Sequence, residues 1–157
     1  MERAALLKHL AADLREEFGQ QEATERLLER QEKALSHRDA DALEGLNAEL
    51  ERAFRAAEHR QTRRERLVRS LAADQGIAPG IATLGGLIER LGDEGKALAE
   101  QRRELRGLCA RVLQRSRKNG ALIAAHRRVT GDVLAALLGD RTEREALGGG
   151  VLVDAKV

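Results

Sequence analysis

The chain has 157 residues, enough for one domain, and it contains two phenylalanines but no tryptophan or tyrosine. Alanine, leucine, arginine and glutamate dominate, which is typical of long helices and excludes a β-sandwich, a base-stacking nucleic-acid binder and an aromatic-walled pocket. The net charge of +2 conceals an uneven distribution: residues 1–50 carry 7 basic and 12 acidic side chains, whereas residues 100–128 carry 9 basic and 2 acidic ones.

Residues 2–37 are predicted to form one helix. They contain no proline, and leucines recur every seventh position, with Gln21 at one place in the series. Such a repeat keeps one face of a helix against a partner helix. The segment is therefore expected to be half of a coiled coil.

A second helix is predicted over residues 40–74, where leucines again recur at a seven-residue spacing. Asp39 can cap its first turn, so residues 36–39 are expected to form a tight connection. The two helices then fold back on each other as an antiparallel hairpin in which both repeats keep the same register. The pairs expected to face each other are Leu35 with Leu43, Leu28 with Leu50, and Leu7 with Leu71.

Proline and glycine interrupt the chain after the hairpin. Pro79 lacks a backbone donor and disfavours a helix before it, so residues 76–80 are predicted to be a break. A short helix over residues 82–91, a second break at residues 92–95 and a long helix over residues 96–138 follow. The predicted fold is all-α, an elongated bundle of three to four helices built from the hairpin, the short helix and the long C-terminal helix.

The length of the last helix gives a functional clue. If it packs antiparallel to the second helix with Leu98 near Ala57 and Val112 near Leu43, it runs past the hairpin tip beyond about Arg115. Residues 119–138 then have no intramolecular partner, although they carry an apolar stripe, which is typical of a binding surface. We expect one helical domain over residues 1–147, with this stripe as its binding segment, and a flexible tail over residues 148–157. The same helix can also pair with its counterpart in a second chain, so a homodimer stays open.

The sequence offers little for catalysis, and we expect neither an enzyme nor a bound cofactor or metal. The single cysteine, Cys109, excludes an internal disulfide and a cysteine-based zinc site, and lies among apolar neighbours. No apolar stretch is long enough for a membrane span, and the amino terminus does not resemble a signal peptide. The predicted register brings none of the histidines together: His9, His37, His59 and His126.

The basic segment has three alternative explanations. Its charges can balance the acidic first helix across the bundle, attract an acidic protein partner, or contact nucleic acid through a basic face from Arg102 to Arg128. We favour the first and place nucleic acid last. Use of the basic face from Arg102 to Arg128 underlies an alternative function, that of a structural coiled-coil or nucleic-acid-associated protein.

Three stretches together resemble the FlgN-type flagellar export chaperones. The first is residues 27–35 (LLERQEKAL) followed by 38–46 (RDADALEGL), which is similar to the family's turn from the first helix into an aspartate-led second helix. The second is residues 83–88 (TLGGLI), and the third is residues 105–108 (LRGL) leading to 118–123 (KNGALI). The resemblance covers about residues 5–139 in the family's order and spacing.

This resemblance implies a cytoplasmic bacterial chaperone of type III export and flagellar assembly. Its partners would be the hook-associated proteins of the hook–filament junction, whose helical ends it would bind to prevent premature assembly, together with components of the export apparatus. In the family the carboxy-terminal region binds the substrate. The substrate-binding residues implied here are Asn119, Leu122, Ile123, His126, Val129, Val133, Leu134 and Leu137.

Overall fold

A computed structural model describes the backbone of residues 3–78 and 82–147 and the side chains of these residues as far as 135. The tail predicted over residues 148–157 lies outside the described residues. All described secondary structure is helical, so the all-α prediction is confirmed. The elements are α1 (Arg3–His37), α2 (Ala40–Asp74), α3 (Leu84–Leu91), the short 3₁₀ helix η2 (Gly92–Gly95) and α4 (Lys96–Leu147).

The chain separates into two compact units, Met1–Asn119 and Gly120–Val157. The first unit contains α1, α2, α3, η2 and the beginning of α4. The second contains the rest of α4. The boundary falls beside Asn119, where the predicted binding segment begins; that residues 1–147 act as a single domain stays a prediction.

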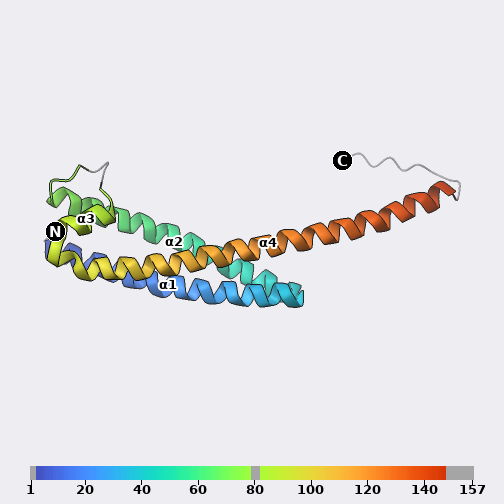
Figure 1. The fold of residues 1–157 in the computed structure, drawn as a ribbon, viewed down its shortest axis with the longest axis horizontal. Helices are drawn as coiled ribbons and strands as arrows, with labels where there is room; N and C mark the ends of the chain where they lie inside the picture. Colours follow the sequence, from blue (N-terminus) through green and yellow to red (C-terminus); the bar gives the residue numbers. More distant parts are fainter. Residues whose placement is uncertain (1–2, 79–81, 148–157) are drawn as a thin grey trace. The chain divides into compact units, whose positions relative to one another are not determined.

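The first two helices form the predicted hairpin and lie side by side (Figure 1). The turn is tight because Arg38 adopts a positive φ of 55° and Asp39 caps α2. The Asp39 carboxylate accepts a hydrogen bond from the Ala42 backbone N–H at 3.0 Å, which satisfies one of the free donors of the first turn. Two residues therefore suffice to reverse the chain.

The register of the hairpin is also as predicted. Leu28 and Leu50 share one core cluster, and Leu7 packs against the cluster that contains Leu71. Gln31 Nε2 donates to Asn47 Oδ1 at 2.7 Å, one helical turn inward from Leu35 and Leu43 respectively. The seven-residue repeats therefore set both the pairing and its alignment.

The short helix α3 begins at a cap, since Thr83 Oγ1 accepts a hydrogen bond from the Gly86 backbone N–H at 3.1 Å. Its buried side chains, which include Leu87 and Leu91, join the core cluster formed by the start of α1 and the end of α2. The link to α4 is close-packed: a Cβ on Gly95 would lie 2.6 Å from the Ile88 carbonyl oxygen, which only glycine allows. The chain thus turns into α4 directly beside α3.

Helix α4 runs parallel to α1 within the first unit, and therefore antiparallel to α2. Arg3 pairs with Glu94 just before α4 begins, and Lys118 pairs with Glu32 near the end of α1. The alignment with α2 differs from the expected one, because Val112 packs with Leu50 rather than lying near Leu43. The difference arises from the tight link through Gly95, because this link starts α4 level with the end of α2. As a result α4 stays packed beyond Arg115, as far as Asn119.

Candidate functional site

The predicted binding residues are distributed along α4 in three kinds of surroundings. Three apolar side chains form what we call the exposed apolar strip: Val129, Val133 and Leu134, which are 57%, 52% and 53% exposed. His126, one turn before, is also exposed, whereas Leu122 and Ile123 are half-buried. Leu137 lies in α4, but its side chain is outside the described part of the structure. The strip is therefore the solvent-facing apolar part of the predicted segment, as far as the side chains are described.

Asn119 differs from the other predicted residues because it is only 1% exposed. Its Nδ2 donates to the Leu28 carbonyl oxygen at 2.8 Å and to Gln31 Oε1 at 2.9 Å. Gln31 in turn donates to Asn47, so one polar chain connects α4, α1 and α2. A buried polar residue at such a position fixes helix register. Asn119 belongs to the bundle interior and is not part of the exposed apolar strip.

Part of the predicted basic face is neutralised by α1. Arg111 pairs with Glu25 at 3.0 Å, Arg115 with Glu29 at 3.0 Å, and Lys118 with Glu32 at 2.6 Å. The hydrogen bond from Lys118 is the main reason why the pKa of Glu32 is lowered. Charge balance between the acidic first helix and the basic last helix therefore operates here, as the charge distribution suggested.

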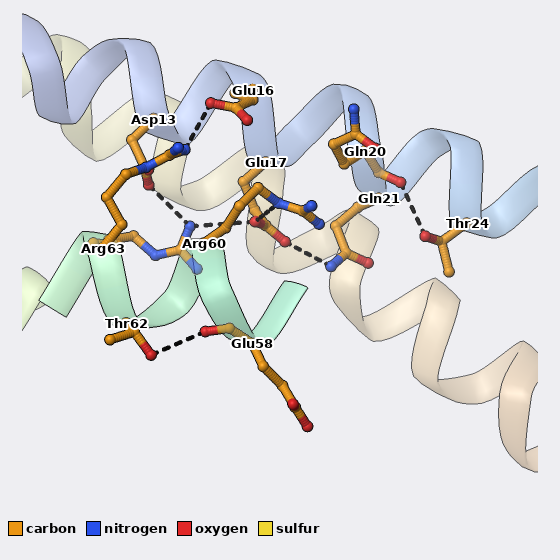
Figure 2. A network of polar contacts seen from close by, with 11 residues as sticks. Asp13, Glu16, Glu17, Gln20, Gln21, Thr24, Glu58, Arg60, Thr62 and Arg63 are labelled. Atoms are coloured by element: carbon orange, nitrogen blue, oxygen red, sulfur yellow. Dashed lines mark hydrogen bonds and ion pairs between the residues drawn. The ribbon is translucent and has the colours of Figure 1, made fainter. Parts of the chain in front are cut away.

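A layer of ions built around two buried carboxylates crosses the hairpin between α1 and α2 (Figure 2). The Asp13 and Glu17 side chains are 2% and 5% exposed. Arg60 Nε donates to Glu17 at 2.7 Å, while Arg63 Nε and Arg64 Nη1 donate to Asp13 at 2.7 Å and 3.2 Å. The seven-residue series of the second helix includes Arg64 but neither Arg60 nor Arg63. The sequence contains a signal for this layer, because Asp13 and Glu17 are four residues apart and the predicted register places each within one residue of facing an arginine, Arg64 and Arg60 respectively.

Glu17 titrates below its ordinary pKa of 4.5. Burial by itself raises the pKa, but hydrogen bonds from Arg60 and Gln21 and the charges of Arg60 and Arg64 together outweigh it. Because the folded-state pKa is depressed, Glu17 stabilises the fold above pH 4.5, and this contribution is lost as the pH falls through the folded-state pKa.

We therefore expect the free energy of unfolding to decrease on acidification below about pH 4.5, and less steeply in Glu17→Gln than in the parent chain. Urea unfolding followed by circular dichroism at several pH values between 7 and 3 measures both slopes. Glu22→Gln is the matched control, since Glu22 is an exposed residue of the same helix. Equal slopes for Glu17→Gln and the parent chain would contradict the assignment.

Other chemistry is sparse in the part of the chain that the structure describes. It contains no group of three or more histidine, cysteine or acidic side chains placed to hold a metal ion. None of its helices is long and apolar enough to cross a membrane. Cys109 is exposed, and partial desolvation of its sulfur together with the charge of Glu17 raises the pKa of the thiol. A raised pKa keeps the thiol protonated and makes it a poor nucleophile.

Comparison with models of known protein families identifies the family to which the chain belongs. The model of the FlgN protein family matches residues 1–147, which include every helix described above. The chain belongs to the FlgN family. Comparisons with curated proteins and with solved structures gave no match. FlgN proteins are flagellar export chaperones, and this all-α FlgN protein is accordingly a chaperone of flagellar assembly and export.

Proposed function

We propose that this FlgN protein binds the helical ends of hook-associated proteins of the hook–filament junction in the bacterial cytoplasm and delivers them to the type III export apparatus. The observation that carries the proposal is the exposed apolar strip of α4. More than half of each of its three side chains faces solvent, and such clustering is typical of a surface that a partner covers.

The mechanism is helix capture. An amphipathic cargo helix would place its apolar face on Val129, Val133 and Leu134, which keeps that face from pairing prematurely with other subunits. Complete burial of one such side chain contributes about 1.5–3 kcal/mol, so three contacts allow binding that is specific but still reversible at the export gate. Neither a nucleotide nor a metal is needed.

Val133→Glu tests the proposal in the full chain. Placing a charge in the covered strip is expected to weaken cargo binding at least tenfold, a change of about 1.4 kcal/mol. The affinity is measured by isothermal titration with purified junction proteins of the same organism. Ala124→Glu is the matched control, because position 124 is exposed and lies on the opposite face of α4. Unchanged affinity in Val133→Glu would contradict the proposal.

The nucleic-acid alternative has less support. Arg111, Arg115 and Lys118 already pair with carboxylates of α1, which removes three of the charges available for phosphates. If this function were the true one, duplex DNA would bind at low salt and dissociate steeply as salt rises. A homodimer through the exposed apolar strip is the other alternative, and sedimentation of the chain without cargo distinguishes it.

A further inference from the structure

A second surface lies within the first unit, in a groove of about 490 Å³. Its lining includes Leu14 and Glu17 of α1, Ala57 and Arg64 of α2, and Leu105 and Cys109 of α4. Because Leu14 and Glu17 are almost completely buried, we take them as the floor and the residues of α2 and α4 as the two walls. The groove is open because α2 and α4 present small side chains, Ala57 and Cys109, at this level. Leucines fill the neighbouring levels of the bundle.

Apolar side chains continue the groove toward the hairpin turn. Phe54 lies about one turn from Ala57 on α2, and Leu113 lies about one turn from Cys109 on α4. Since the two helices are antiparallel, both residues lie beyond the same end of the groove. Both are among the large apolar side chains that the structure leaves exposed. A ligand with an apolar stripe would find contacts along this line.

The rim of the groove is basic. Arg102 and Arg106 of α4 also line it, and among the described residues neither has a carboxylate within 4.0 Å. The acidic group in the floor, Glu17, is already bonded to Arg60. The α4 wall therefore offers two uncompensated guanidinium groups beside the buried Leu14 and the already paired Glu17, and an occupant with carboxylates along its edge complements them.

We propose that this groove docks an amphipathic helix that carries acidic residues along its flank, at a site separate from the exposed apolar strip. The stretch from Arg102 to Leu113 is about 16 Å long at 1.5 Å per residue, which matches three turns of a partner helix. The proposal does not depend on the identity of the cargo. It adds a second contact surface to the chaperone.

Cys109 provides the test, since it is the chain's single cysteine and lines the groove. The probe is a synthetic 18-residue helical peptide with leucines on one face and glutamates beside them; the control peptide has lysine in place of each glutamate. We expect a saturating amount of the glutamate peptide to slow alkylation of Cys109 by N-ethylmaleimide at least fivefold, measured by mass spectrometry. The lysine peptide is expected to have less than a twofold effect.

Two variants separate the groove from the rest of the molecule. The double variant Arg102→Glu with Arg106→Glu should reverse the preference between the peptides, whereas Val133→Glu should leave protection of Cys109 unchanged even where cargo binding is lost. Equal protection by both peptides, or protection by neither, would overturn the proposal. The proposal would also be overturned if alkylation of Cys109 became slower when the concentration of the chain alone is raised. A second copy of the chain would then cover the groove.

Discussion

Replacing Arg60 with leucine is expected to lower the free energy of unfolding by about 3 kcal/mol, because the change leaves the Glu17 carboxylate buried without its main partner. Arg60 Nε lies 2.7 Å from Glu17 Oε2, and both side chains are almost completely enclosed. Arg64, 3.6 Å from the same oxygen, compensates only in part. Urea unfolding at pH 7 followed by circular dichroism measures the loss.

Two controls make this expectation specific. Arg55→Leu removes an exposed arginine that pairs with Glu51 within the same helix, and we expect it to change stability by less than about 0.5 kcal/mol. The double variant Glu17→Leu with Arg60→Leu removes both charges and should recover at least half of the loss, since a buried pair replaced by apolar groups is often neutral. A double variant as unstable as Arg60→Leu alone would show that packing, rather than the unpaired charge, causes the loss.

Leu108→Ala is expected to destabilise the first unit by about 2–5 kcal/mol. Leu108 is fully buried and belongs to the cluster in which α4 meets Leu28 of α1 and Leu50 of α2. Truncation removes apolar contacts and leaves a cavity that rigid helices fill only in part. The midpoint of urea unfolding, with an unchanged slope, reports the effect.

Leu113→Ala is the matched control on the same helix. The Leu113 side chain is exposed, so its truncation should alter stability by less than about 0.5 kcal/mol. Because it adjoins the groove at Cys109, the same variant should weaken protection of Cys109 by the glutamate peptide. A large loss of stability in Leu113→Ala would mean that the residue packs more deeply than the structure indicates.

The helices and the hairpin follow from the sequence because they depend on short-range patterns. Leucines seven residues apart define the faces of α1 and α2, Asp39 defines the turn, and Gly76, with a positive φ of 67°, lies just beyond the end of α2. The Leu28–Leu50 pairing needs nothing beyond the turn and the repeat. The apolar residues of the exposed strip were likewise recognisable from helical spacing, and family membership from motifs in the correct order.

Only the tertiary structure decided how α4 lies against the hairpin. Its alignment depends on the close approach of Gly95 to Ile88, which no periodic pattern encodes, and a shift of a few residues changed which predicted site residues are buried. Asn119, predicted to bind a substrate, is bonded inside the bundle for this reason. The ion layer around Glu17 and the groove at Cys109 also required the structure. Each depends on side chains from helices far apart in the sequence, and only packing shows whether a charge is paired or a small residue leaves a space.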